Sequence, residues 1–232
     1  MNLSPLLRPV KERNTLEQTI ENLLAAVRLG AVGVGERLPA ERDLSVQLGV
    51  SRMTLRAALQ ALADRGVVET RRGRAGGTTV VQDGPPVVDR DRAALRRADV
   101  LDLLAYRAVV EPGAAELAAA RDITAADRMR LTDRLVDTTA RKGRAARLAD
   151  IQLHVLIGEL SGSSLLAAAV AEVQIRLDDV LTALSNLAGP ATADAQNGAV
   201  VRSILAGRAA EARQAMCDQL GSTASLILDA LP

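Results

Sequence analysis

The sequence of 232 residues contains no phenylalanine, no tryptophan and one tyrosine, Tyr106. A hydrophobic fraction of 48% therefore has to form its core from alanine and aliphatic side chains. Strands favour β-branched and aromatic residues, whereas alanine and leucine favour helices. The composition predicts a mostly α protein and argues against a β-sandwich.

Cysteine and histidine each occur once, as Cys217 and His154. One cysteine excludes an intramolecular disulfide and is typical of a protein in the reducing cytoplasm. One histidine and one cysteine also leave no supported pair of nucleophile and base. We therefore predict a cytoplasmic protein that is not an enzyme.

Long apolar runs are also missing. The richest apolar stretch, residues 165–175, is too short to span a membrane and contains Glu172. The first residues lack the apolar run of a signal peptide. We expect no membrane association, and the length suggests two domains.

The net charge of +1 is unevenly distributed. Residues 1–82 hold 12 Lys/Arg and 8 Asp/Glu, whereas residues 83–232 hold 17 and 20. A basic first part joined to an acidic second part is typical of a small nucleic-acid-binding domain attached to a different domain.

Helical periodicity and turn residues divide the first part. Helices are predicted over 15–29, from Pro39 to Gly49 and from Ser51 to Gly66, and strands over 67–70 and 78–81. Ser51 is a good N-cap, and Gly49 allows a tight turn between the last two helices. We predict a winged helix-turn-helix over residues 1–82, followed by a linker over 83–92 that contains two prolines.

The second part shows helical periodicity to its end and no convincing strand. We predict an all-α bundle over residues 93–232 with six or seven helices, and we consider a break of the first one near Pro112. The expected helices lie at 93–121, 124–142, 146–161, 164–187, 194–206 and 208–231.

The start of the third predicted helix carries side chains that can contact DNA. Arginine can bind guanine with two hydrogen bonds, and Ser and Thr can bind phosphates or bases. The alternative is a solvated face of ion pairs, but no acidic residue separates Arg52 from Arg56. We predict DNA contacts from the helix start, from the preceding helix and from the hairpin loop: Arg42, Ser51, Arg52, Thr54, Arg56, Arg72 and Gly73.

This region resembles the DNA-binding domain of GntR-type bacterial transcription regulators. The resemblance rests on residues 38–73, which read LPAERDLSVQLGVSRMTLRAALQALADRGVVETRRG. It implies that Arg42, Arg52, Thr54, Arg56 and Gly73 match positions that contact DNA in the family. It further implies a homodimer on a palindromic operator of double-stranded DNA, most commonly a repressor that its effector releases.

Residues 99–119 and 150–154 resemble the FadR subfamily, whose all-helical effector-binding domain is named FCD. Many members hold a divalent metal with one aspartate and three histidines. Asp150 and His154 match two of these ligands, while Asn197 and Gln219 stand where the other two histidines are expected. Amide oxygens are weak ligands for such metals, so we assign no cofactor and expect any divalent metal to bind weakly.

Two further interpretations of the second domain stay open. Asp150 and His154, four residues apart, can form a helical carboxylate–imidazole pair without a ligand. Alternatively, Asn197 and Gln219 bind a small effector directly, together with Arg107, Asp150 and His154. Arg107 either pairs with Glu111 or grips a carboxylate of that effector.

The combined prediction is a transcription regulator, a repressor by expectation, whose affinity for DNA responds to a small organic acid. The alternative is an effector-independent DNA-binding protein whose bundle serves dimerisation only. Some GntR-type proteins carry a pyridoxal-phosphate enzyme domain, which needs a lysine for its Schiff base. The only lysine after residue 82 is Lys142, in a predicted loop, so the enzyme alternative lacks support.

Overall fold

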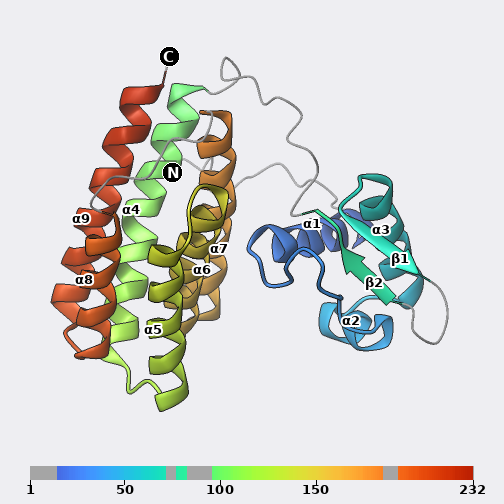
Figure 1. Cartoon of the computed structure of the whole chain (residues 1–232), viewed down its shortest axis with the longest axis horizontal. Helices are drawn as coiled ribbons and strands as arrows, with labels where there is room; N and C mark the ends of the chain where they lie inside the picture. Colours follow the sequence, from blue (N-terminus) through green and yellow to red (C-terminus); the bar gives the residue numbers. More distant parts are fainter. Residues whose placement is uncertain (1–14, 72–76, 83–95, 185–192, 232) are drawn as a thin grey trace, which may run out of the picture. The chain divides into compact units, whose positions relative to one another are not determined.

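The structure, a computed structural model, describes residues 15–71, 77–82, 96–184 and 193–231 (Figure 1). The chain divides into two compact units, residues 1–86 and 87–232, and each is considered by itself. The linker predicted at 83–92 lies outside the described residues.

The first unit is a winged helix-turn-helix, as predicted. Its elements are α1 (Thr15–Arg28), α2 (Glu41–Leu48), α3 (Arg52–Asp64), β1 (Val68–Arg71) and β2 (Gly77–Val80). Leucine and valine side chains from all five elements form one core, which includes Leu23, Leu44, Leu55, Leu62, Val68 and Val80. This core fixes α3 by its apolar face and leaves the opposite face in solvent.

The turn between α2 and α3 depends on a glycine. Gly49 has a φ of 65°, and its N–H donates to the carbonyl oxygens at the end of α2. A side chain at this φ clashes with the backbone, so glycine is the residue that fits best. Two residues later, Ser51 begins the next helix, because its hydroxyl accepts a hydrogen bond of 3.0 Å from the N–H of Thr54.

The wing is an antiparallel hairpin. Its register pairs Val68 with Val80 and Arg71 with Gly77, so each strand lies within one residue of its predicted position. Arg37 forms a further antiparallel bridge with Thr79. The alternation of the hairpin places Val68 and Val80 in the core and leaves Glu69 and Arg71 exposed.

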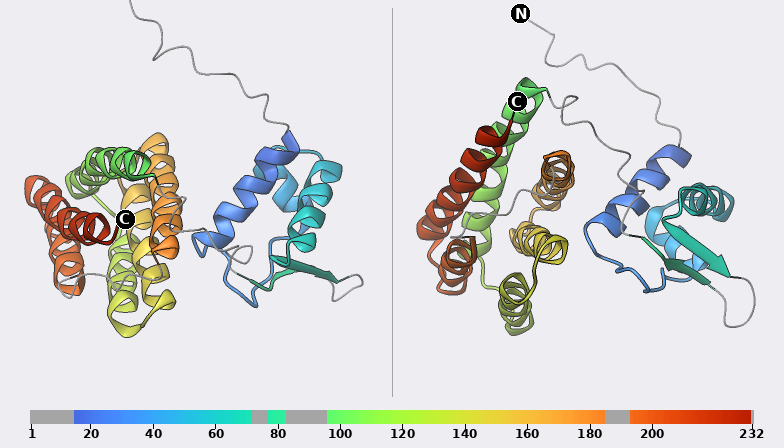
Figure 2. Two further views of the ribbon diagram at one scale, coloured as in Figure 1. Left: turned by 90° about the horizontal axis from the view of Figure 1, so that it is seen from above. Right: turned by 45° about the horizontal axis from the view of Figure 1, so that its top comes forward.

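The second unit is an all-α bundle. Its described helices are α4 (Arg97–Ala120), α5 (Ala125–Ala140), α6 (Arg144–Leu160), α7 (Ser164–Ala183), α8 (Ala193–Leu205) and α9 (Ala209–Ala230). Helix α4 packs against α6, α7, α8 and α9 and lies between α9 and α7 in the views of Figure 2. None of the helices in the described part of the chain has the length and hydropathy that a membrane span requires.

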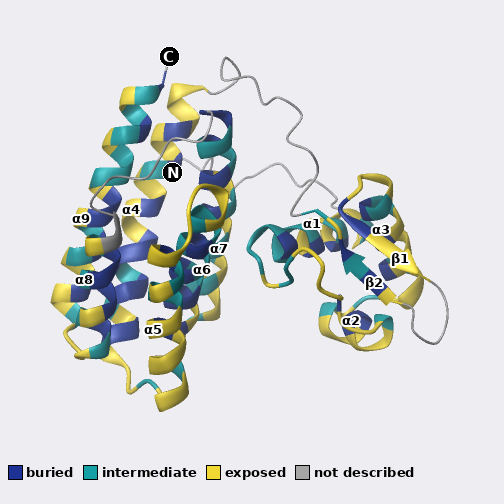
Figure 3. Ribbon diagram, in the orientation of Figure 1, coloured by how far each residue is buried: buried dark blue, intermediate teal, exposed yellow. Residues whose placement is uncertain are grey.

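Helix α4 remains continuous through Pro112, so the break that we considered there does not occur. Proline lacks the N–H that would donate to the carbonyl oxygen of Ala108, which removes one helical hydrogen bond. Pro112 is itself buried, and the residues on both sides of it belong to one core: Val100, Leu103 and Val110 before it, and Ala114, Ala115 and Ala118 after it. Packing along the whole helix offsets the lost bond. Figure 3 shows the alternation of buried and exposed positions along α4.

Replacing Gly49 with alanine tests the left-handed turn. We expect Gly49→Ala to destabilise the first unit by about 1 kcal/mol, because an L-residue resists this φ. Hydrogen exchange of peptides from residues 15–71 measures the stability of this unit separately. Gly33→Ala is the matched control, since its Cβ would meet only ordinary contacts with the Glu36 side chain. Equal protection in both variants would contradict the role given to Gly49.

Candidate functional site

The first turn of α3 is preorganised by two hydroxyl groups. Ser51 and Thr54 share a hydrogen bond of 2.8 Å between their side-chain oxygens, in addition to the cap on the Thr54 N–H. Both residues lie at the surface end of the helix, where Ser51 is exposed. The Thr54 hydroxyl keeps at least one free lone pair and can accept a hydrogen bond from outside, and the Ser51 hydroxyl can do so when it is the donor of the shared bond.

Arg52 is the least constrained cation of this turn. Its side chain is exposed, and no hydrogen bond or ion pair joins it to another described residue. The neighbouring Met53 is 81% exposed and extends the same surface. An exposed guanidinium without a partner at the start of this helix can bind an external anion or a base edge.

The other two predicted arginines have acidic neighbours. Nε of Arg56 donates to Glu41 on α2 at 2.7 Å, and Nε of Arg42 donates to Asp43 at 3.1 Å. Both arginines remain largely exposed, so these pairs contribute little and can be exchanged for other partners. Sequence spacing could not show the pair of Arg56, because Glu41 lies on a different helix.

The predicted contacts from the hairpin loop, Arg72 and Gly73, lie outside the described residues. The last described residue before them, Arg71, is exposed and pairs with Glu69 on the same strand at 3.2 Å.

A buried carboxylate organises the polar interior of the second unit. Glu111 on α4 accepts hydrogen bonds at Oε1 from Nε of Arg107 at 2.8 Å and from the amide of Gln174 on α7 at 2.9 Å. Its Oε2 lies 2.5 Å from Nδ1 of His154 on α6. One carboxylate thus connects three helices, and all four side chains are buried.

Asp150 lies beside this group of four but bonds elsewhere. Asn197 on α8 donates to its Oδ1 at 2.7 Å, whereas its Oδ2 lies 3.9 Å from Nε2 of His154. The separation of 3.9 Å is too long for a hydrogen bond. The helical pair of Asp150 with His154 is therefore a distant ion contact. The histidine bonds instead to a carboxylate from another helix, because its Nδ1 faces α4 in the bundle interior.

The interior retains unused hydrogen-bonding atoms. Among the described residues, Arg107 Nη1, His154 Nε2, Gln174 Oε1 and Gln219 Oε1 are buried without a partner. Most buried polar atoms in proteins are satisfied, and each exception costs about 1–3 kcal/mol. These four atoms lie on α4, α6, α7 and α9 of the same bundle.

Electrostatics within the cluster favour a charged pair. Burial by itself would raise the pKa of Glu111, but Arg107 and His154 outweigh it and lower this pKa from 4.5 to about 2. Burial would likewise lower the pKa of His154, but the carboxylates of Glu111 and Asp150 raise it above 6.5. The imidazolium and the carboxylate thus stabilise each other's charged form.

The structure places the predicted effector residues in one bundle, where Arg107, His154, Asn197 and Gln219 are buried and the side chain of Asp150 is 33% exposed. Sequence reasoning considered Glu111 only as a partner of Arg107, and it missed Gln174 entirely. The sequence pattern of α7 could have indicated Gln174, because this residue lies between the buried Val170 and Val173 on one side and the buried Leu177 on the other. A polar residue within an apolar helical stripe is a candidate for an interior site.

The donor set does not fit a tightly held transition metal. Asp150 and His154 offer one carboxylate and one imidazole nitrogen, whereas Asn197 and Gln219 contribute amides in place of the two further histidines. The amide nitrogen of Asn197 is already bonded to Asp150. No cluster of three His, Cys, Asp or Glu side chains with metal-binding geometry occurs among the described residues. Imidazole and carboxylate hold Zn, Ni or Mn far better than amides do, so we derive no chemistry from a metal.

Two protein families match the two units. Residues 15–80 match the bacterial regulatory proteins of the gntR family, and residues 102–221, more than half of the chain, match the FCD domain. The chain belongs to the GntR family. Its FCD domain agrees with the FadR-like architecture expected from the sequence.

Individual relatives match parts of this GntR-family chain. It is 48% identical over 86 residues to RmpR of Mycobacterium gastri, covering 37% of this chain and 31% of that protein. It is 37% identical over 115 residues to the Glc operon transcriptional activator of Escherichia coli, covering 48% of this chain and 42% of that protein. The chain thus spans less than half the length of these curated relatives.

The fold is also that of a solved structure, E. coli McbR/YncC. The comparison has a TM-score of 0.56 at 18% identity and covers 93% of this chain and 98% of that one. At this identity the likeness supports the fold alone.

Removal of the central charge tests the buried cluster. We expect Glu111→Gln to destabilise the bundle by about 3 kcal/mol, because it leaves the charge of Arg107 buried without its counter-charge. Urea unfolding at pH 7, followed by circular dichroism, measures the change. Glu172→Gln is the matched control, since Glu172 forms an exposed ion pair with Arg176 four residues away. This control should change the stability by less than about 1 kcal/mol, and a similar loss in both variants would contradict the role of burial.

The two shifted pKa values predict opposite trends with pH. The pKa of His154 is higher in the folded state than its ordinary value of 6.5. Its contribution to the free energy of unfolding is therefore complete below pH 6.5 and is lost as the pH rises further. The pKa of Glu111 is lowered to about 2, so its contribution is present above pH 4.5 and is lost as the pH falls toward 2. The stability difference between the native protein and His154→Gln should therefore shrink above pH 6.5. A constant difference between pH 6 and pH 9 would contradict a protonated His154.

Proposed function

We propose that the protein is a DNA-binding transcription regulator. The observation that carries this proposal is the exposed first turn of α3 in a helix-turn-helix, where Arg52 has no partner among the described residues. The match to the gntR family over residues 15–80 supports the same function. The chain offers no supported catalytic pair, so we propose a regulator without enzymatic activity.

The proposed docking follows from helix geometry. Helix α3 has 13 residues and thus a length of about 20 Å, and its core-facing side is fixed by Leu55, Leu59 and Leu62. Its first turn would enter the major groove, where Arg52 can bind guanine and Ser51 and Thr54 can bind phosphate or base edges. Arg42 and Arg56 would exchange their exposed acidic neighbours for phosphates. Arg72 and Gly73 are proposed contacts from the wing.

A homodimer would place two such helices on a palindromic operator. Half-sites about 34 Å apart, one turn of DNA, match the two-fold symmetry of such a dimer. The dimer, the operator and a cytoplasmic location remain predictions from the family resemblance and the composition.

The bundle is proposed to bind a small carboxylate. The unpaired N–H groups of Arg107 and His154 can donate hydrogen bonds to its oxygens. The amide oxygens of Gln174 and Gln219 can accept hydrogen bonds from a ligand or water. Asp150 and Asn197 lie beside this group and complete the predicted effector site. Four buried polar atoms without partners would destabilise a bundle that served dimerisation only. We therefore favour the effector-dependent regulator over the effector-independent one.

Effector binding would regulate DNA affinity if the ligand prefers one arrangement of the dimer. We propose that the protein represses transcription and that the effector releases it from DNA. One relative is named a transcriptional activator, and the position of the operator relative to the promoter decides between the two outcomes. A reporter gene placed behind the operator distinguishes them.

The DNA interface is tested by removing Arg52, which has no partner in the described part of the chain. We expect Arg52→Ala to weaken binding by about 1–3 kcal/mol, because a bidentate contact to a base is lost. Binding is measured by gel shift on duplexes selected from a random-sequence library by the native protein.

Arg65→Ala is the control, because Arg65 lies at the opposite end of the same helix and its replacement also removes one positive charge. Its affinity should stay close to that of the native protein. Unchanged binding by Arg52→Ala, or failure to select any duplex at low salt, would refute the proposed interface.

A further inference from the structure

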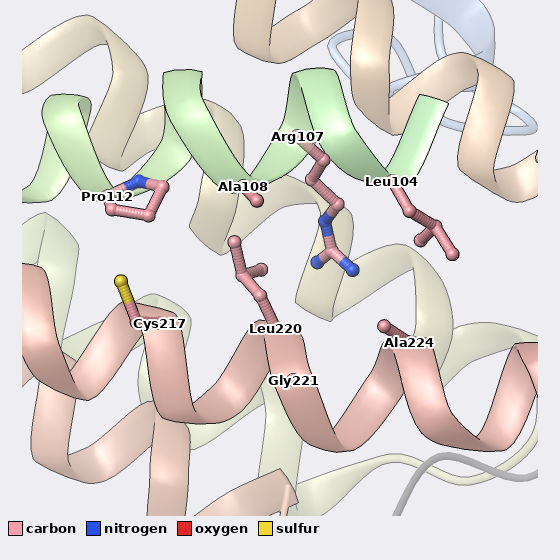
Figure 4. Close-up of a pocket in the computed structure, with 8 residues that line it drawn as sticks. All are labelled: Leu104, Arg107, Ala108, Pro112, Cys217, Leu220, Gly221 and Ala224. Atoms are coloured by element: carbon pink, nitrogen blue, oxygen red, sulfur yellow. The ribbon is translucent and has the colours of Figure 1, made fainter. Parts of the chain in front are cut away.

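A pocket of about 160 Å³ lies between α4 and α9 (Figure 4). Its walls are mostly hydrocarbon. Leu104, Ala108 and Pro112 line it from α4, and Leu220, Gly221 and Ala224 line it from α9. The pocket is open to solvent beside Ala108 and Gly221, which are exposed, and its volume is about that of a molecule of six carbon atoms.

Among the described residues that line the pocket, Arg107 alone is charged. Its side chain projects from α4 toward α9 in Figure 4 and is only 2% exposed. Its Nε is bonded to Glu111, whereas its Nη1 has no partner among the described residues. A guanidinium has five N–H donors and can bind a second carboxylate along its free edge. The pocket therefore combines apolar walls with one buried and unused cationic donor.

The carboxylate of Glu111 does not use up this donor. Its Oε1 is shared between Arg107 and Gln174, and its Oε2 is bonded to His154. The position of Glu111 on the same helix, four residues away, fixes Arg107 Nε in place. This internal pair orients the guanidinium, while Nη1 stays buried without a partner among the described residues.

We propose that the α4–α9 pocket holds the hydrocarbon chain of a short monocarboxylic acid whose carboxylate binds Nη1 of Arg107. The inference rests on the proposed function, because it specifies the class of effector that the bundle takes. Apart from Arg107 and Cys217, the described lining residues have no side chain that can form a hydrogen bond. A hydroxyl or second carboxylate placed there would lose its hydration without compensation, whereas each methylene gains from burial.

The experiment measures acids of increasing chain length by calorimetry on the full chain. From acetate to hexanoate, we expect affinity to rise about fourfold for each added methylene. Malate and citrate, which are polar along their whole length, should bind much more weakly than hexanoate.

Two variants separate the pocket from the rest of the bundle. A Cβ on Gly221 or on Gly113 meets no atom within 4 Å, so both helical glycines accept a larger residue without a clash at that atom. Gly221→Leu fills the pocket and should weaken hexanoate binding roughly tenfold or more, while acetate binding changes little. Gly113→Leu adds the same side chain to α4 outside the pocket lining and should leave both affinities unchanged.

Cys217 gives an independent readout, because this single cysteine lines the same pocket and is partly exposed. Saturating hexanoate should slow its alkylation by iodoacetamide, and acetate at equal occupancy should not. This protection reports pocket occupancy without any measurement of DNA binding.

The outcomes distinguish the pocket from the wider function. If malate or citrate binds and alters DNA affinity while hexanoate does neither, the pocket assignment is wrong and the effector function stands. Equal hexanoate affinity in Gly221→Leu and Gly113→Leu also overturns the pocket assignment. If no acid of the set binds, both the pocket assignment and the proposed carboxylate effector fail.

Discussion

The buried carboxylate of Glu111 is the constraint on which the second unit depends. It lies on the central helix α4 and holds Arg107, His154 and Gln174 by direct hydrogen bonds, so it connects α4 to α6 and α7. The desolvation cost of such a group is large, and only several compensating partners make it tolerable. Apolar side chains of the same volume often serve stability equally well, so stability alone does not explain the polar cluster. The proposed effector would give the unpaired atoms of the cluster hydrogen-bonding partners.

The sequence predicted the architecture well because local rules and tertiary packing agree. The cap at Ser51, the turn at Gly49 and the leucine periodicity of α3 each act within a few residues, so the helix-turn-helix can be read directly. The predicted boundaries of the bundle helices differ from the observed ones by a few residues. The break considered at Pro112 did not occur, because long-range packing outweighs the loss of one hydrogen bond. That balance depends on neighbouring helices, which no local pattern contains.

The candidate sites were predictable only in part. Family resemblance singled out Asp150, His154, Asn197 and Gln219 in the bundle, but it gave no indication of how they are paired. Their pairing depends on which helices face one another, and this is why His154 bonds to Glu111 rather than to the aspartate on its own helix. The same reason explains the pairing of Arg56 with Glu41 across two helices. Residue types can be predicted from sequence, whereas partners that lie far apart in it require the fold.

Because the chain has no Phe and no Trp, its single tyrosine can serve as an intrinsic fluorescent probe. Tyr106 is 45% exposed on α4 and precedes Arg107 directly. All intrinsic ultraviolet fluorescence of the chain therefore originates from one ring, on the outer face of the central helix of the bundle. Changes in the surroundings of that ring can be followed by emission intensity in the unlabelled native protein, without background from any other part of the molecule.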